Sequence, residues 1–293
     1  MELQRRRSIA LPQILATWLL LMAAYTGPAE CIRRTSRFHG EDEGDGSGAV
    51  EAFKYSATAC RVHTASLADF GGVGDGATSN TAAFSAAVTH LSQFASDGGG
   101  MLFVPAGRWL TGPFNLTSSF TLFLHRDAVI LATREMNEWP IIDPLPSYGR
   151  GRDAAGGRYS SLIGGSNLTD VIITGDNGTI DGQGAFWWSK FHGHKLKYTR
   201  GYLIELMHSD QIFISNLTLL NSPSWNIHPV YSSNIVVSGI TILAPVHSPN
   251  TDGINPDSCS NGDGAQPCPF PTDASPMDDV QLQECTYVKA ISA

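Results

Sequence analysis

The residues best suited to chemistry lie in one polar stretch, Asn250-Thr251-Asp252-Gly253, with a second carboxylate at Asp257. Crowded carboxylates push each other's pKa values apart, so that one stays protonated near the working pH. Hydrolysis of a glycosidic bond uses this difference: one carboxylic acid protonates the leaving oxygen, and in inverting enzymes a second carboxylate activates water. Asn, Asp, Gly and Pro also favour turns, so a polar turn between strands is the alternative interpretation, and we assign Asp257 to it.

The sequence that leads to this stretch resembles the polygalacturonase-like glycoside hydrolases of plants, family 28 of the pectin lyase-like β-helix superfamily. The resemblance is carried by residues 221–230 (NSPSWNIHPV), by residues 234–245 (NIVVSGITILAP) and by the Asn-Thr-Asp-Gly stretch behind them. Members of this family are right-handed parallel β-helix enzymes that cut pectin. The resemblance therefore implies inverting hydrolysis of α-1,4-galacturonosyl bonds in the cell wall, with Asp252 as a water-activating catalytic carboxylate.

The resemblance covers residues 68–261 and stops there. The family's general acid lies one coil later, in Gly-Asp-Asp, followed by Gly-His-Gly and Arg-x-Lys, and residues 262–293 contain none of these motifs. Asp278 and Asp279 are adjacent, but Met277 stands where the family has Gly. We expect a truncated or divergent tail over 262–293 without a strand of the family type, and no useful hydrolysis of polygalacturonate by the chain as written.

Asn250 and His228 are candidate substrate-binding residues. Their spacing in the sequence is close to one coil of a solenoid, so we expect their side chains to stack. The alternative is a polar pair that closes two turns. No metal site is expected, because the cysteines are scattered and two nearby histidines, His192 and His194, rarely form one by themselves.

Two other classes of function are weighed against a pectin hydrolase. A catalytically incomplete relative would bind pectin without cutting it, or would be a non-functional truncated product. A β-helix polysaccharide lyase would abstract a proton with a basic residue and would usually need calcium. The sequence shows no acidic cluster suited to calcium, and Asn-Thr-Asp-Gly belongs to the hydrolases, so the lyase is disfavoured.

A glycine-rich loop raises a cofactor question. Gly72, Gly74 and Ala77 form a G-x-G-x-x-A pattern ahead of a helix, with Asp97 about twenty residues on, as in dinucleotide sites. However, Asp97 lies in a glycine-rich loop rather than at a strand end, and no βαβ pattern follows. The family opens its β-helix with a similar Phe-Gly-x-x-Gly-Asp-Gly motif, so we expect no cofactor.

The chain has 293 residues and a formal net charge of -8. This charge argues against nucleic acid as a partner, because phosphate binding needs a basic face. It also gives no long-range attraction to anionic pectin, so binding would need local Lys and Arg. Residues 186–198 mix aromatic and basic side chains that could stack on sugars and pair with uronates. The alternative is a loop with its tryptophans packed beneath it.

The N-terminus indicates secretion. Arginines at positions 5–7 precede an apolar run over 14–24, which predicts a signal peptide over 1–29, with a membrane anchor as the alternative. An acidic, Gly-rich arm follows over 30–60. The five cysteines would be partly oxidised in a secreted chain, with a pairing that the sequence does not reveal. We expect a monomeric cell-wall protein with N-glycans at the four acceptor sequons, Asn115, Asn167, Asn177 and Asn216.

The scaffold is predicted to be an all-β parallel β-helix over 61–261, with an N-terminal helix near 80–94 across its open end. The helix has an apolar stripe at Phe84, Ala87, Val88 and Leu91; Ser79 and Asn80 are its expected caps, and the three glycines at 98–100 are expected to end it. Short β-rich runs follow, at 101–104, 120–124, 128–131, 171–174, 211–214, 217–220 and 234–237. The runs that begin at 211 and 234 align position by position, at a spacing that is typical of a solenoid, and residues 167–175 resemble an earlier coil.

Overall fold

The computed structural model describes residues 61–145, 153–154, 156–257, 280–283 and 286–290. The predicted signal peptide, the predicted arm, all five cysteines and the Asp278-Asp279 pair lie outside these residues. Among the described residues, no helix is both long enough and apolar enough to cross a membrane.

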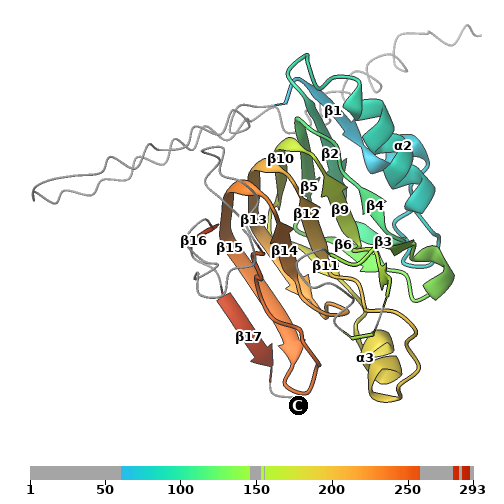
Figure 1. The fold of residues 1–293 in the computed structure, drawn as a ribbon. Helices are drawn as coiled ribbons and strands as arrows, with labels where there is room; N and C mark the ends of the chain where they lie inside the picture. The colour runs from blue at the N-terminus through green and yellow to red at the C-terminus, as the bar shows by residue number, and fades with distance from the viewer. Residues whose placement is uncertain (1–60, 146–152, 155, 258–279, 284–285, 291–293) are drawn as a thin grey trace, which may run out of the picture. The chain divides into compact units, whose positions relative to one another are not determined.

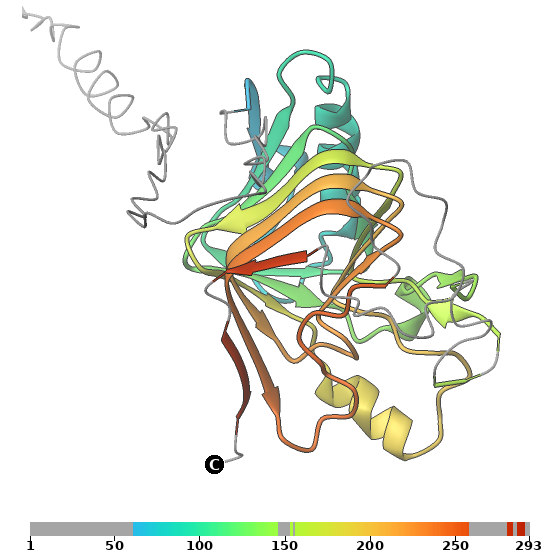
Figure 2. The same ribbon diagram turned by 60° about the vertical axis from the view of Figure 1, so that its left-hand side comes forward.

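Successive turns of the chain stack into a parallel β-helix, as predicted (Figure 1). The larger sheet has one row of strands made of β1 (His63–Ser66), β2 (Gly100–Val104), β5 (Phe120–Leu124), β10 (Thr169–Gly175), β13 (Asp210–Leu220) and β15 (Ser233–Pro245). It continues from β13 through β11 (Gly178–Asp181), β6 (Ala128–Ala132) and β3 (Gly107–Thr111). The second sheet contains β14 (Ile227–Val230), β12 (Ile204–Met207), β9 (Ile163–Ser166) and β4 (Phe114–Asn115). Strands within both sheets pair in parallel, and Figure 2 shows the coils stacked along one axis.

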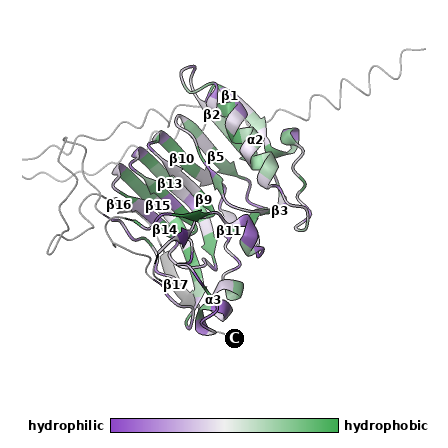
Figure 3. Ribbon diagram, turned by 45° about the vertical axis from the view of Figure 1, so that its right-hand side comes forward, coloured by the Kyte–Doolittle hydropathy of each residue, from purple (hydrophilic) through white to green (hydrophobic). Residues whose placement is uncertain are grey.

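The strand register confirms the predicted repeat. Ile212 pairs with Ile235, as the alignment of the two runs predicts, and Val171 pairs with Ile212 across the insertion, so residues 167–175 are the earlier coil. The side chains of Val171, Ile212 and Ile235 are 0%, 0% and 1% exposed, and they form one buried column along the solenoid axis. Hydrophobic residues recur along the strands of the stack (Figure 3). Each coil therefore buries its apolar residues against the next coil.

One backbone conformation repeats near the start of three neighbouring strands and accounts for polar residues there. Asp170, Gln211 and Asn234 are the second residues of β10, β13 and β15, where they lie in register on successive coils, and all three have a positive φ. Asn and Asp tolerate this left-handed conformation better than most other residues. Two of these three positions accordingly hold Asp or Asn.

Helix α2 (Thr81–Ser92) forms as predicted, and its apolar stripe of Phe84, Ala87, Val88 and Leu91 is buried. It packs against β2 and β4, and its role as a cap over the end of the solenoid stays a prediction. The helix ends at Ser92, well before the glycines that were expected to end it.

The prediction that Ser79 and Asn80 cap this helix is wrong. Asn80 makes no capping bond; its side-chain oxygen accepts from the amide of Val73 at 2.7 Å, and its amide donates to the carbonyls of Val73 and Leu110. The hydroxyl of Ser79 lies against the hydroxyl of Thr81 rather than a helix amide. Asn80 itself is 1% exposed, and its side chain bonds to the backbone of the preceding loop and of β3 instead of the helix.

The glycines of the G-x-G-x-x-A pattern have a packing role. A Cβ atom on Gly72 or on Gly74 would lie 3.1 Å from the indole ring of Trp109, which is tighter than ordinary contact. Trp109 is 4% exposed and belongs to the main core. The loop therefore needs glycine to lie flat on this tryptophan.

Residues 262–293, in which we expected no strand of the family type, do contain strands. β16 (Val280–Gln283) and β17 (Thr286–Ala290) both pair in parallel with β15, in the register Ile235 to Val280 and Thr241 to Thr286. The first segment alternates apolar and polar residues, which is the sequence pattern of a strand. β16 has only four residues, so its alternation is hard to recognise in the sequence of the tail.

Candidate active site

The Asn-Thr-Asp-Gly stretch leads directly into a further rung of the second sheet. Ile254 and Asp257 form isolated parallel bridges with Ile227 and Val230 of β14. Just before them, the amide of Asn226 donates to the carbonyl of Asp252 at 3.1 Å, so the pairing begins at the candidate base. The backbone of Asp252 is therefore held by the sheet, even though the stretch around it has the composition of a turn.

Asp252 occupies a position that repeats on the two preceding rungs. It lies two residues before Ile254, as Trp225 lies before Ile227 and Tyr202 before Ile204. Tyr202 and Trp225 are buried and stack with ring centroids 5.0 Å apart. Asp252 is exposed, whereas its neighbour Thr251 is fully buried. The row of aromatic side chains thus ends at an accessible carboxylate.

Buried polar contacts hold the loop in front of Asp252. Thr251 and Ser248 share a short hydrogen bond between their hydroxyl groups, and Ser248 also donates to the carbonyl of Pro245 at 2.6 Å. Arg200, which is fully buried, donates to the carbonyls of Pro223 and Pro249 at 2.9 Å each. Asp153 lies 2.8 Å from the Arg200 Nε atom and balances its charge. Arg200 therefore ties the loop to the preceding coil.

The predicted stacking of Asn250 on His228 is wrong. The two isolated bridges set the register of this rung, and in that register Asn255, not Asn250, lies beside His228. The turn over residues 246–250 makes this coil longer than the repeat that holds between β13 and β15. Asn250 itself is exposed, with a φ of 52°, and its carbonyl accepts a hydrogen bond from Ser224.

His228 belongs to a buried charged cluster that the sequence analysis missed. Its Nδ1 atom lies 2.9 Å from Glu205 on β12, and Arg158 holds the same carboxylate through both oxygens at 2.7 and 2.8 Å. Arg158 lies on β8 (Arg158–Tyr159), which pairs antiparallel with β7 (Ile141–Ile142). Glu205 and His228 have the same spacing in the sequence as Ile212 and Ile235, so their pairing on neighbouring rungs could have been predicted.

The cluster sets the protonation state of Glu205. Burial raises the pKa of this carboxyl, but the His228 hydrogen bond and the charge of Arg158 outweigh burial and hold the pKa below its usual value. The ring of His228 is fully buried, and its Nε2 atom has no hydrogen-bond partner among the described residues. The structure therefore places His228 inside the wall of the site rather than on its surface.

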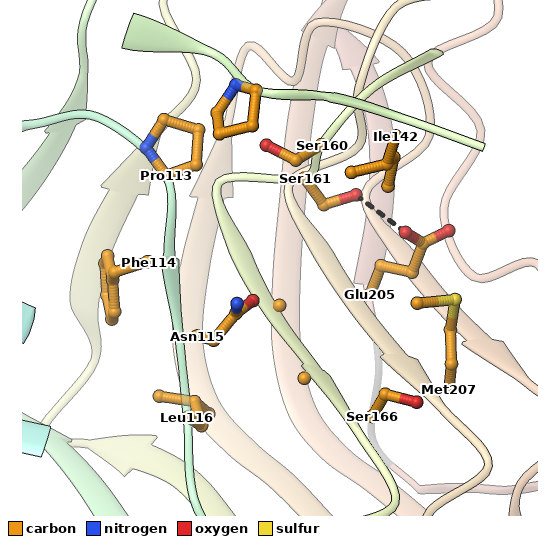
Figure 4. Close-up of a pocket in the computed structure, with 13 residues that line it drawn as sticks. Pro113, Phe114, Asn115, Leu116, Ile142, Ser160, Ser161, Ser166, Glu205 and Met207 are labelled. Carbon is orange, nitrogen blue, oxygen red and sulfur yellow. Dashed lines mark hydrogen bonds between the residues drawn. The ribbon is translucent and has the colours of Figure 1, made fainter. Parts of the chain in front are cut away.

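A pocket of about 420 Å³ lies beside Glu205 on strands β4, β9 and β12 (Figure 4). Its walls are made by Pro113, Phe114, Asn115, Leu116, Pro140, Ile142, Ser160, Ser161, Gly164, Gly165, Ser166, Glu205 and Met207. The hydroxyl of Ser161 donates to Glu205 at 3.3 Å. No group of three or more His, Cys, Asp or Glu side chains suited to a metal occurs in the part of the chain that the structure describes.

Of the two interpretations of residues 186–198, the structure agrees with the one in which the tryptophans are packed. Residues 185–192 form helix α3 (Ala185–His192), in which Trp187 and Trp188 are 0% and 6% exposed. The indole of Trp188 donates to the carbonyl of Ser222 at 3.1 Å. These tryptophans are therefore core residues and do not offer a face to sugars. The asparagines of all four sequons are exposed, and their glycosylation stays a prediction.

Comparison with known proteins identifies the family. Residues 132–262 match the model of glycosyl hydrolases family 28. A "Probable polygalacturonase" of Vitis vinifera is 74% identical over 212 residues, which are 72% of this chain and 43% of that protein. An "Endo-polygalacturonase" of Pectobacterium carotovorum subsp. carotovorum is 31% identical over 166 residues, which are 52% of this chain and 40% of that protein. The chain thus spans less than half the length of these relatives.

Solved structures show the same fold. An exopolygalacturonase from Thermotoga maritima superposes with a TM-score of 0.61 at 25% identity, over 77% of this chain and 52% of that one. The polygalacturonase from Erwinia carotovora ssp. carotovora shares the fold, with a TM-score of 0.50 at 20% identity, over 73% of this chain and 63% of that one. This chain belongs to the polygalacturonase-like proteins of glycosyl hydrolases family 28.

Proposed function

We propose that Asp252 is the water-activating base for inverting hydrolysis of the α-1,4-galacturonosyl bonds of pectin in the cell wall, a reaction that also needs a general acid. The observation that carries the proposal is an exposed carboxylate, Asp252, on the next rung of a sheet whose preceding rungs hold buried aromatic rings at the same position. The names of the relatives, which are polygalacturonases, support the substrate class.

The base would remove a proton from a water molecule on the far side of the sugar from the leaving oxygen. An inverting pair needs about 6.5–9.5 Å between its carboxyl groups to leave room for that water. A sheet-held backbone at Asp252 suits this task, because a displacement of about 1 Å can cost a hundredfold in rate. The general acid has no assigned residue, since the family's Gly-Asp-Asp motif is absent from the printed sequence.

The two remaining candidates take different roles in this proposal. Asn250 is exposed two residues before Asp252, where its side-chain amide can bond sugar hydroxyls. His228 is fully buried, so we assign it an indirect role in substrate binding: it holds Glu205 and thereby the wall on which the substrate lies.

A second candidate function is pectin binding without hydrolysis. It is favoured by one observation: residues 132–262, which match the family model, hold the Asn-Thr-Asp-Gly stretch but none of the Gly-Asp-Asp, Gly-His-Gly and Arg-x-Lys motifs, so this part of the site offers a base without an acid. Secretion, a monomeric state and N-glycans at the four sequons are part of both proposals.

One experiment separates these functions. The protein is expressed in a secretory host and incubated with polygalacturonate, and polymer binding, reducing ends and unsaturated ends are measured together. Hydrolysis predicts binding and new reducing ends without unsaturated ends. Binding alone favours the second candidate, unsaturated ends would indicate a lyase, and a folded protein with neither binding nor cleavage would refute both proposals.

A further inference from the structure

One of the four glycan acceptor sequons lies on the outer face of the second sheet. In strand β4, Phe114 is 4% exposed and stacks on Phe84 of α2 with ring centroids 4.3 Å apart, whereas Asn115 is exposed. Successive side chains of a strand point to opposite faces, so the side chain of Asn115 is directed away from the core. The Asn-Leu-Thr sequon at 115–117 therefore presents its acceptor on the outer face.

The backbone on both sides of this acceptor is bonded to the neighbouring coil. The amide of Phe114 donates to the carbonyl of Leu162 at 2.9 Å, and the amide of Leu116 donates to the carbonyl of Gly164 at 2.8 Å. Leu116 is 5% exposed, so buried side chains flank Asn115 on both sides. A group attached to Asn115 is therefore held over this part of the sheet.

The side chain of Asn115 is directed over the pocket (Figure 4). A Cβ atom on Gly164 of the next rung would lie 2.7 Å from the Oδ1 atom of Asn115, so the side chain extends along the sheet toward β9. Among the described residues that line this pocket, Asn115 is the one acceptor asparagine of a sequon. N-glycans are bulky and hydrated, so one attached here would cover a pocket of about 420 Å³.

The pocket lies on the same sheet as the candidate base. From Asn115 the sheet continues through β9, β12 and β14 to the rung of Asn255. Strands in a sheet are about 4.8 Å apart, so four steps put the rung of Asn115 about 19 Å from the rung that Asp252 precedes. A long pectin chain that runs along the sheet from Asp252 would reach the pocket, whereas a short oligomer at Asp252 would not.

We propose that Asn115 is an N-glycosylation site whose glycan stands over this pocket and closes this end of the second sheet to pectin. The inference rests on the proposed secretion and pectin binding, and it adds a limit on the length of chain that the sheet can bind. In the modification, the Nδ2 atom of Asn115 loses a proton to solvent and bonds to the anomeric carbon of a lipid-linked oligosaccharide. The lipid diphosphate leaves with the electron pair of the broken C–O bond. The glycan then occupies space that a long pectin chain would otherwise fill.

The test is the binding of long polygalacturonate and of a short oligogalacturonate to the intact protein from a secretory host, with the occupancy of Asn115 measured by mass spectrometry of the glycopeptide. Thr117→Ala removes the sequon and keeps Asn115; it should bind the long polymer about tenfold more tightly and the short oligomer equally. Thr117→Ser keeps the sequon and should bind like the unaltered protein. Thr179→Ala is the matched control: Thr179 is half-buried like Thr117, and its loss removes the sequon at Asn177, beside β11 of the larger sheet.

An unoccupied Asn115, or equal binding of the long polymer by the unaltered protein and Thr117→Ala, would overturn the inference while leaving the proposed pectin function intact. A gain of the same size for the short oligomer, for Thr117→Ser with an occupied Asn115 or for Thr179→Ala would also overturn it, because the gain would not come from a glycan over the pocket. A folded protein that binds neither probe in any form would refute the proposed function, and the inference would fall with it. If Thr117→Ala does not fold, trimming the glycans of the unaltered protein with an endoglycosidase gives the same comparison.

Discussion

Replacing Arg158 with methionine should strongly destabilise the fold, because it leaves Glu205 buried without its cation. The two side chains are 3% and 2% exposed and lie 2.7 Å apart, so the Glu205 carboxylate depends on Arg158 for its charge compensation. Removing one member of such a buried pair typically costs about 3–5 kcal/mol. Methionine keeps much of the volume of the arginine stem, so the loss would report charge and hydrogen bonding rather than an empty cavity.

The assay is urea unfolding followed by circular dichroism, with a double-mutant cycle. Arg158→Met and Glu205→Leu should each be costly alone, and the double variant should recover a large part of the loss because no uncompensated charge remains. Asp97→Asn is the matched control: its ion pair with His63 is exposed, with Asp97 77% accessible, and such pairs contribute about 0.2–1 kcal/mol. A cost below about 1 kcal/mol for Arg158→Met would refute this account of the cluster.

The same cluster predicts a direction for the pH dependence of stability. The pKa of Glu205 is lower in the folded protein than in the unfolded chain, where a glutamate titrates near about 4.3. Its stabilising contribution is therefore present above that value and is lost as the pH falls below it and through the folded pKa. The Arg158→Met variant should lose less stability than the unaltered protein over this acid range, because the depression of the pKa is relieved.

Three further predictions address the scaffold. Ile212→Ala, at a fully buried position of the central column, should lower the free energy of unfolding by about 2–5 kcal/mol in urea titrations, and a cost near zero would contradict the stacked core. Asn80→Ala should cost about 1–3 kcal/mol in the same assay because it removes three side-chain hydrogen bonds to the backbone of Val73 and Leu110, whereas Ser79→Ala should be nearly neutral; equal effects would contradict the structural assignment. Asp75 accepts hydrogen bonds from the backbone of Thr78 and neighbouring residues that lower its pKa to about 2, so its carboxyl carbon should show no titration between pH 4 and 7 by NMR, and a midpoint near 4 would contradict that turn.

Much of the scaffold could be predicted because its signals are local and repeated. The alignment of the runs that begin at 211 and 234 gave the pairing of Ile212 with Ile235, and a repeat of this kind specifies both the strand and its neighbour. The apolar stripe of α2 identified the buried face of the helix for the same reason.

The remaining features depend on contacts that no local pattern records. Asn80 has the composition of a helix cap, but the carbonyl of Leu110, far along the chain, competes for its amide. Asn250 and His228 have nearly the spacing of one coil, yet the longer turn at 246–250 changes the register. The partner of Arg158 comes from a different coil, and the antiparallel strand that carries Arg158 interrupts the repeat. Such irregular contacts can be recognised only in the three-dimensional structure.

The central claim is that Asp252 activates water on a pectin-binding sheet. The most direct measurement is the rate of reducing-end release from polygalacturonate by a longer relative that carries the same Asn-Thr-Asp-Gly stretch together with the family's general acid. The aspartate corresponding to Asp252 is replaced with asparagine, and folding is checked by circular dichroism. The account predicts a rate about 10²–10⁴-fold lower with unchanged folding. An unchanged rate would remove Asp252 from the mechanism.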